Sequence, residues 1–496
     1  MSTGFLARLA RRTSIEALQA EGGRAGLRRA LRGRDLIAVG LGSMIGGGIF
    51  TTIGPGVAKA GPAIIVAFML AGLASLFAAL CYAELGSMVP VAGSAYTYAY
   101  ATLGQLVAWI IGWDLTLEYA VGAATVAIAW SEYFNKVLQF VGIQIPFEWC
   151  HSPFESAMDG SGAHGIVNIP AVVILFLVTL LLIRGIQESA FVNNIIVITK
   201  LAIVVAVIVI GWGFMNPANH TPYIPAATTY TTPEGVTHPF GGIMGILGAA
   251  GVVFFAFIGF DAVSTAAQET INPKRDMPIG ILGSLVICTT LYVLFSHVLS
   301  GVATVTDFRT AGKEASVAYA ITKYMIGYGW LAKLVTVAIL FGFSSVILVM
   351  LLGQSRVFYS MSRDGLIPAM FSDVHSKFRT PYKNNLLFFV VTAIFGGFIP
   401  GDIVGEMTSI GTLFAFILVC IGVWIMRKRR PDIQRGFTVP ALPVVAVLGI
   451  FTCGAMIFGL GWTNWVRLIV WMAIGLVVYF TYSRHHSKLT AGGNAK

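Results

Sequence analysis

The sequence predicts an all-α integral membrane protein with twelve transmembrane helices. The first observation is composition: of 496 residues, 56% are hydrophobic and 11% are charged, whereas soluble domains carry roughly 25% charged residues. The second is the length of the apolar runs. Residues 63–89 and 331–355 are almost continuously apolar, and a helix needs roughly 20 such residues to cross the hydrocarbon core. The third is that these runs do not show the alternation over roughly ten residues that is typical of a membrane barrel. A soluble globular protein is therefore excluded.

Polar segments between the apolar runs set the boundaries of the twelve predicted spans. These are residues 36–60, 63–89, 103–130, 168–184, 190–215, 242–267, 278–303, 330–356, 385–400, 404–426, 442–461 and 465–483.

The basic residues predict the orientation of the chain. With the N-terminus inside, 24 of the 32 Lys and Arg residues fall on the inner side, 7 fall on the outer side, and Lys200 falls within a span. Basic residues gather on the cytoplasmic side of membrane proteins, so the basic segment 1–35 and the tail 484–496 are both expected in the cytoplasm. Anionic lipid of the inner leaflet favours the same bias. The net charge of +10 is thereby explained by membrane lipid, and no nucleic-acid partner is expected.

The first span contains a run of glycines that predicts a break in the helix. Gly46, Gly47 and Gly48 are consecutive near the expected bilayer midplane, and each interior glycine costs a helix about 1 kcal/mol relative to alanine. Irregular backbone at this depth persists only where it lines a cavity or is buried in protein. One interpretation is a half-helix N-terminus that binds a carboxylate. The other is close helix packing, because Gly42 and Gly46 form a GxxxG pattern.

The sixth span carries a second signal of the same kind. Gly259 and Asp261 lie together past the midpoint of an apolar segment, where an ionisable group is costly and is a functional candidate by default. Span 6 stands five spans after span 1, which is an odd number, so the two spans run in opposite directions, as an inverted five-helix repeat requires. We therefore predict a first repeat over 36–215, a second over 242–426 and two further helices over 442–483. Paired breaks favour a transporter over a scaffold.

Span 5 contains a buried lysine. Lys200 lies about ten residues into the span, roughly 15 Å deep, where its side chain cannot reach the interface. Three interpretations remain open. Lys200 is a candidate for proton exchange during transport, for a fixed cation in place of a bound sodium ion, or for a structural ion pair with a carboxylate such as Asp261.

Further carboxylates of interest lie in spans 2 and 3. Asp114 and Glu118 are at i and i+4 on one face of span 3, where two neighbouring carboxylates cannot easily both ionise. Glu118 is near the middle of its span and is predicted to face the substrate side chain, whereas Asp114 is expected to be structural. Glu84 is near the inner end of span 2, where pairing at the interface is the ordinary explanation and a gating role is the alternative.

The remaining reactive residue types do not form a recognisable site. The five cysteines show no CxxC spacing, and the histidines lack ligand spacing. We therefore expect no metal, no cofactor and no enzymatic activity. The sequence contains no Walker A motif, so the energy for transport is expected from an ion gradient or from exchange.

Several motifs in order resemble the amino acid, polyamine and organocation transporter superfamily, and most closely its cationic amino acid transporter branch. The motifs are Gly42–Phe50, Cys81–Leu85, Pro90–Tyr98, Gly112–Tyr119, Phe257–Val263, Asn272–Pro278, Ser362–Pro368 and Gly411–Phe416.

This resemblance implies the leucine-transporter fold, with ten core helices in two inverted repeats plus helices 11 and 12. It assigns the substrate carboxylate to Gly46, Gly47 and Gly48, and Phe255 to an aromatic gate above the substrate. It implies a proton-coupling role for Lys200. The backbone carbonyls expected to hold the substrate amino group are those of Met44 or Ile45, Phe255, Ala256 and Ile258.

Two features of the sequence differ from what is common in this branch. Residues 267–271 read Ala-Gln-Glu-Thr-Ile where paired acids are common, which puts a charge network there in doubt. Gly47 stands where a bulkier residue is frequent, so the selectivity stays open.

We therefore expect a secondary active amino acid transporter of the cell membrane that works by alternating access and is proton-coupled. The alternative in the same class is an amino acid or polyamine exchanger without proton coupling. The alternative from another class is a sensor or scaffold that has lost transport. The substrate, cationic or neutral, and the oligomeric state stay open.

Overall fold

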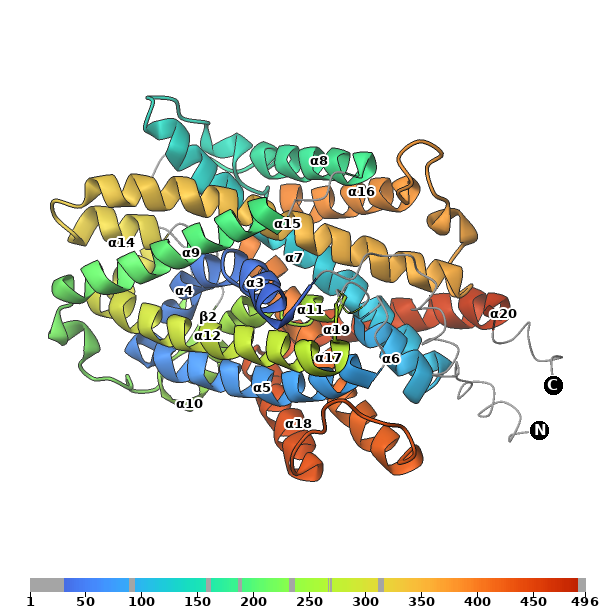
Figure 1. The fold of residues 1–496 in the computed structure, drawn as a ribbon. Helices are drawn as coiled ribbons and strands as arrows, with labels where there is room; N and C mark the ends of the chain where they lie inside the picture. The colour runs from blue at the N-terminus through green and yellow to red at the C-terminus, as the bar shows by residue number, and fades with distance from the viewer. Residues whose placement is uncertain are drawn as a thin grey trace, which may run out of the picture.

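A computed structural model describes residues 31–488 apart from 89–93, 158–161, 186–189, 232–236, 266, 268–269 and 311–315. Within these residues the chain is almost entirely helical, and most of the long helices run along one common direction (Figure 1). Eight helical segments of the described chain are long and apolar enough to cross a membrane, and two shorter helices are also apolar. The expected all-α multi-pass membrane protein is confirmed at this level, while the number of crossings stays a prediction.

Each predicted span coincides with one or more helices. In chain order these are α3 (Gly33–Met44) and α4 (Gly47–Ala60), α5 (Ile64–Met88), α7 (Gln105–Gln139), α8 (Ile169–Arg184), α9 (Ala190–Gly211), α10 (Gly242–Val253) with η5 (Phe254–Phe257) and α11 (Ala262–Thr265), α12 (Pro273–Val302), α15 (Gly329–Arg363), α16 (Tyr382–Phe398), α17 (Gly401–Arg429), α18 (Leu442–Gly459), and α19 (Trp462–Val478) with the π-helical turn η8 (Tyr479–Ser483) and α20 (Arg484–His486).

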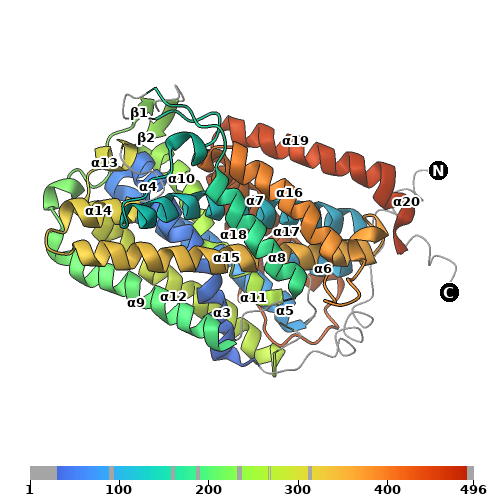
Figure 2. The ribbon, with the colours of Figure 1, turned by 90° about the horizontal axis from the view of Figure 1, so that it is seen from above.

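The structure also contains elements between the spans. α7 and α15 continue to Gln139 and Arg363, beyond the expected ends at 130 and 356, because polar residues at a helix end can meet water once the chain leaves the apolar layer. The connecting elements are α6 (Ser94–Thr102), the 3₁₀ turns η1 (Gly61–Ala63), η2 (Phe147–Trp149), η3 (Trp212–Phe214), η4 (Pro217–His220) and η7 (Ala369–Ser372), the antiparallel strands β1 (Thr228–Thr231) and β2 (Thr237–Phe240), and the helices α13 (Val305–Thr310) and α14 (Ser316–Tyr324). The strands pair next to α10 and α13, at the end of the molecule opposite α20 (Figure 2).

Local chemistry fixes the ends of several helices. The Asn168 side-chain oxygen accepts a hydrogen bond from the Ala171 N–H at 3.1 Å and caps α8, and Pro170 occupies the first turn, where a missing N–H costs nothing. Gly185 ends the same helix in the left-handed conformation with φ 73°, which glycine adopts without steric cost.

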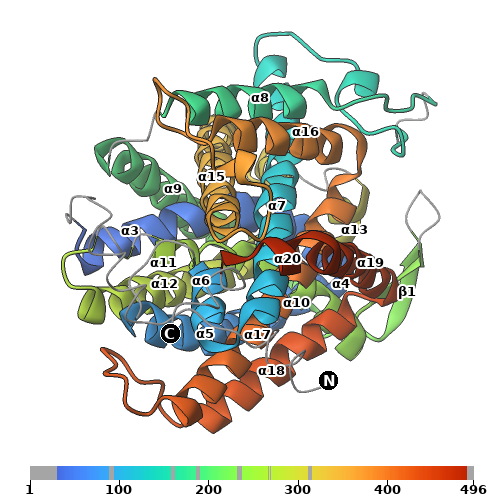
Figure 3. The ribbon, with the colours of Figure 1, turned by 90° about the vertical axis from the view of Figure 1, so that its right-hand side faces the viewer.

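The helices are arranged around α7. Viewed along the helices, α7 lies near the centre, α8 and α16 lie side by side at one edge, and α18 lies at the opposite edge (Figure 3). α7 packs extensively against α15 and α17, and α12 packs against α3 and α5. We call the side on which α5 and α17 end the inner side and the side on which α4 ends the outer side. The basic-residue bias predicts that the inner side faces the cytoplasm.

Candidate functional site

The first span is broken where the glycines predict it. α3 ends at Met44, the Ile45 N–H bonds to the Leu41 carbonyl at 2.8 Å, and Ile45 is extended with ψ 114°. Gly46 follows with φ 139°, a conformation that L-residues with a side chain rarely adopt. α4 then begins at Gly47. The first N–H groups of α4 have no acceptor within the helix, as at every helix start. These donors lie at the break.

The sixth span is broken in a corresponding way. α10 tightens into the 3₁₀ turn η5, Ile258 is extended with ψ 133°, and Gly259 has φ +118°. The Asp261 carboxylate accepts the Gly259 N–H at 3.2 Å, which satisfies a backbone donor that the break has released. Asp261 thus has a structural task in shaping the second break.

The two breaks contact each other directly. The Ser43 hydroxyl donates to the Gly259 carbonyl at 2.9 Å, which joins the end of α3 to the second break. On the other side of the crossing, a Cβ added to Gly48 would overlap the Ala256 Cα and lie 2.7 Å from the Ala256 Cβ. Glycine at 48 therefore allows the start of α4 to lie against η5. The irregular backbone of both spans meets in one buried place.

Lys200 lies at this crossing. Its side chain is 2% exposed, and its ammonium group donates to the Gly42 carbonyl at 2.9 Å. Gly42 is in the last turn of α3, where the carbonyl dipoles favour a cation. A Cβ on Gly46 would lie 3.1 Å from the Lys200 Nζ, and one on Gly342 would lie 3.0 Å from its Cε. The two glycines leave the space that the lysine side chain fills.

The wall opposite Gly47 is aliphatic. A Cβ on Gly47 would lie 2.8 Å from a Val126 methyl group on α7 and 3.0 Å from a Val346 methyl group on α15. Both valines are buried. The backbone of the first break therefore faces branched side chains on this side.

Buried carboxylates lie next to the crossing. Glu118 and Asp114 are fully buried on α7, and by distance and angle no described group donates a hydrogen bond to either carboxyl group. The neighbouring Thr412 hydroxyl donates instead to the Thr408 carbonyl at 3.0 Å. Burying an ionised carboxylate without partners is very costly, so this pair suits a proton or a bound cation.

Tyr119 connects α7 to the second break. Its hydroxyl donates to the Asp261 carboxylate, and Glu118, one residue earlier, interacts electrostatically with Asp261 and Asp114. Sequence reasoning missed Tyr119 and Ser43. Tyr119 does lie within the Gly112–Tyr119 motif, so the motif drew attention to the segment but not to this contact.

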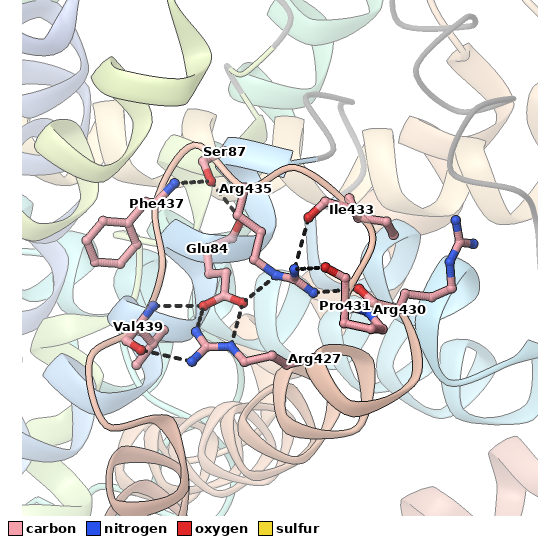
Figure 4. Close-up of polar contacts among 9 residues, drawn as sticks. All are labelled: Glu84, Ser87, Arg427, Arg430, Pro431, Ile433, Arg435, Phe437 and Val439. Carbon is pink, nitrogen blue, oxygen red and sulfur yellow. Dashed lines mark hydrogen bonds and ion pairs between the residues drawn. The ribbon is translucent and has the colours of Figure 1, made fainter.

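Two ion pairs join α17 to the segment that follows the first break. On the outer side, Lys59 at the end of α4 donates to Glu406 at 2.7 Å. On the inner side, the Glu84 carboxylate, 2% exposed, accepts from Arg427 and, at 3.2 Å, from Arg435 (Figure 4). The interfacial pairing expected for Glu84 is therefore present.

The predicted substrate residues fall into two groups. Met44, Ile45, Gly46, Gly47, Gly48, Phe255, Ala256 and Ile258 line or flank the crossing of the breaks and are buried. Glu118 lies beside this crossing, near Asp261. All five cysteines are reduced and buried, and within the described ranges no three His, Cys, Asp or Glu side chains gather as metal ligands would.

Comparison with known proteins identifies the family to which the chain belongs. The model of the amino acid permease family matches residues 31–482, so the chain belongs to that family. This confirms the resemblance to the amino acid, polyamine and organocation superfamily.

Individual relatives cover most or nearly all of the chain. The chain is 44% identical to a branched-chain amino acid permease, BcaP, of Bacillus subtilis over 97% of this chain and 98% of that protein. It is 39% identical to a methylthioribose transporter of the same organism over 97% and 99%. It is 36% identical to the vacuolar cationic amino acid transporter 4 of Arabidopsis thaliana over 82% and 64%. These relatives are named permeases and transporters rather than enzymes.

Proposed function

We propose that the protein is a secondary active amino acid transporter that works by alternating access. In this proposal twelve helices cross the cell membrane, residues 36–215 and 242–426 form two inverted repeats of the leucine-transporter type, 442–483 adds two helices, and both termini are cytoplasmic. The observation that carries the proposal is the crossing of the two helix breaks, where Ser43 donates to Gly259 and Gly48 lies against Ala256. Irregular backbone of this kind is typical of transporter binding sites.

The substrate backbone is bound by the protein backbone. The N–H groups of Gly46, Gly47 and Gly48 receive the α-carboxylate, because the start of α4 presents free donors and the positive end of its dipole. The α-amino group is held by carbonyl groups of the residues around the breaks, which are Met44 or Ile45, Phe255, Ala256 and Ile258. Phe255 covers the bound substrate.

The substrate side chain is aliphatic and neutral. Val126 and Val346 form the wall that faces Gly47, and such a wall offers no partner for a charged side chain. The 44% identity to a branched-chain amino acid permease supports the same class. A cationic side chain is the second candidate, favoured by the two buried carboxyl groups of Glu118 and Asp114.

Lys200 couples transport to protons. Its ammonium group bonds to the Gly42 carbonyl next to the first break, so a change in its charge acts directly on the end of α3 and on Gly46. An exchanger in which Lys200 is a permanent cation is the alternative mechanism.

Uptake into proteoliposomes tests the proposal. All twenty amino acids and methylthioribose are offered with and without an inward proton gradient. We expect leucine, isoleucine or valine to accumulate and the gradient to increase accumulation. Uptake that is indifferent to the gradient would favour exchange, and substrate binding without any uptake would favour a sensor.

The Lys200→Ala variant tests the coupling residue. We expect it to lose gradient-driven uptake while substrate binding stays measurable, because the break keeps its glycines. Lys377→Ala is the matched control, since Lys377 is exposed in the segment between α15 and α16. Undiminished driven uptake by Lys200→Ala would refute proton coupling through this residue.

A further inference from the structure

Glu84 is the centre of a buried polar cluster on the inner side. Its carboxylate accepts from the Arg427 guanidinium twice, once at 3.3 Å from Nε, from Arg435 Nε at 3.2 Å and from the Val439 N–H at 2.8 Å (Figure 4). These donors come from the end of α17, from the segment that follows it and from the residues just before α18. The Glu84 carboxylate of α5 therefore accepts hydrogen bonds from the beginning, the middle and the end of the connection between α17 and α18.

The connection is itself organised around the same groups. Arg435 also donates to the carbonyls of Ile433 at 2.9 Å and Arg430 at 2.8 Å, which closes the segment into a compact loop. The Phe437 N–H donates to the Ser87 hydroxyl at 3.1 Å, one turn beyond Glu84. The last turn of α5 thus holds this loop at two points.

Above Glu84, α5 and α17 meet in a closed seam that leads to the helix breaks. Tyr82 of α5 contacts Phe260, which follows the second break, with ring centroids 5.8 Å apart, and contacts Phe416 of α17 at 5.7 Å. Phe260 and Phe416 complete the triangle at 5.1 Å. These three rings are buried, and they fill the seam beside the second break.

The two helices of this seam belong to different parts of the molecule. The three-residue turn η1 joins α4 directly to α5. We therefore expect α5 to move together with the segment that starts at the first break. α17 packs along α7 instead. A movement of α4 and α5 relative to α7 and α17 would open the seam, and the ion pairs of Glu84 are at its inner end.

We propose that Glu84 is a positioning residue whose ion pairs with Arg427 and Arg435 latch the α5–α17 seam shut on the inner side. Opening the site toward that side requires Glu84 to release both arginines. This role rests on the proposed transport function, because it assigns the seam to the inner gate of that transporter.

Two cysteines of the chain can be used to detect this opening. Cys81 of α5 and Cys420 of α17 are both buried, and the two thiols interact with each other across the seam. Cys81 lies three residues before Glu84 and next to Tyr82, and Cys420 lies seven residues before Arg427, about 10 Å along the helix, so both thiols lie in the seam close to the latch and to the aromatic triangle. Cys288 of α12 is equally buried and serves as an internal reference.

Labelling of these thiols tests the latch. The full chain is placed in lipid nanodiscs, which leave both faces open, and is treated with a charged, membrane-impermeant maleimide, with labelled sites located by peptide mass spectrometry. We expect Glu84→Gln to label Cys81 and Cys420 at least about tenfold faster than the unaltered protein, through a population shift toward the open seam. Asp432→Asn is the matched control, because Asp432 pairs with Arg430 in the same loop but its side chain is 62% exposed.

A second variant keeps the test decisive if Glu84→Gln folds poorly. Arg427→Gln removes one partner and leaves Glu84 bonded to Arg435 and Val439, so we expect a smaller acceleration of about threefold. Labelling of Cys81 and Cys420 at the unaltered rate in both variants would overturn the latch. Equal acceleration at Cys288 would also overturn it, since it would show general loosening.

The labelling result is independent of the transport result. Accelerated labelling of the seam in a protein that takes up no amino acid would contradict the proposed function and support the latch. Normal uptake with unchanged labelling in the variants would remove the latch alone.

Discussion

Replacing Gly48 by alanine tests whether the contact between the two helix breaks forms the binding site. The added Cβ would overlap the Ala256 Cα and lie 2.7 Å from the Ala256 Cβ and 2.8 Å from the Ala256 nitrogen. Ordinary contacts of a Cβ begin at 3.4 Å. The obstructing atoms belong to the backbone and cannot rotate away, so α4 and η5 have to move apart.

The neighbouring Gly47 gives a matched comparison. A Cβ there would meet methyl groups of Val126 at 2.8 Å and Val346 at 3.0 Å, which are ends of side chains and can shift. Overpacking costs about 1–3 kcal/mol. We assign the upper end, about 3 kcal/mol, to Gly48→Ala and the lower end, about 1 kcal/mol, to Gly47→Ala. If the cost falls on the bound geometry, Kd rises about 100-fold or more for Gly48→Ala and about fivefold for Gly47→Ala.

The assay is equilibrium binding of the radiolabelled substrate found in the uptake screen, with thermal denaturation measured in parallel. Gly454→Ala is the control for adding a methyl group to a helix, since nothing lies within 4 Å of that Cβ; it should leave Kd unchanged. A Gly48→Ala variant that binds as tightly as the unaltered protein, or a Gly47→Ala variant that binds more weakly than Gly48→Ala, would refute the reasoning.

Three further predictions concern charged groups. Glu118→Gln is expected to change the ranking of substrates in competition uptake while leaving thermal stability in place, and an unchanged ranking would remove it from the site. Lys59→Met is expected to destabilise the fold by up to about 3 kcal/mol, because it removes the nearest cation of the largely buried Glu406 and leaves Arg467 at 3.9 Å, whereas Lys59→Met with Glu406→Gln should melt higher than the single variant. Burial alone would lower the pKa of His151, but its hydrogen bond to Glu132 raises that pKa to about 9. The folded state holds this proton more tightly than the unfolded state, so the stabilisation is fully present below about pH 6.5 and is lost as the pH rises through about 9. Denaturation temperatures at pH 7 and pH 10 should therefore differ more in the unaltered protein than in His151→Gln.

Local sequence was sufficient to locate the helices and their interruptions. The apolar runs placed a helix in each of the twelve predicted segments because hydrophobicity over about 20 residues is a property of the segment alone. The breaks at Gly46 and Gly259 were also foreseeable, since glycine lacks the side chain that disfavours positive φ. The helix ends were less predictable: α7 and α15 extend past their apolar runs, because nothing stops a helix where the apolar layer ends.

Only the tertiary structure decided which groups meet. Lys200 was recognised as a buried charge, but its bond to the Gly42 carbonyl joins residues 158 positions apart. Glu84 was expected to pair, yet its partner Arg427 lies 343 positions away, and the role of Tyr119 beside Asp261 was not foreseen. Hydrophobic periodicity indicates which residues are buried, but it does not indicate which residues they pack against. The sequence by itself determined a membrane-embedded helical chain with two broken spans and a few buried charges, whereas the packing of distant helices decided that the breaks and several of these charges lie next to one another.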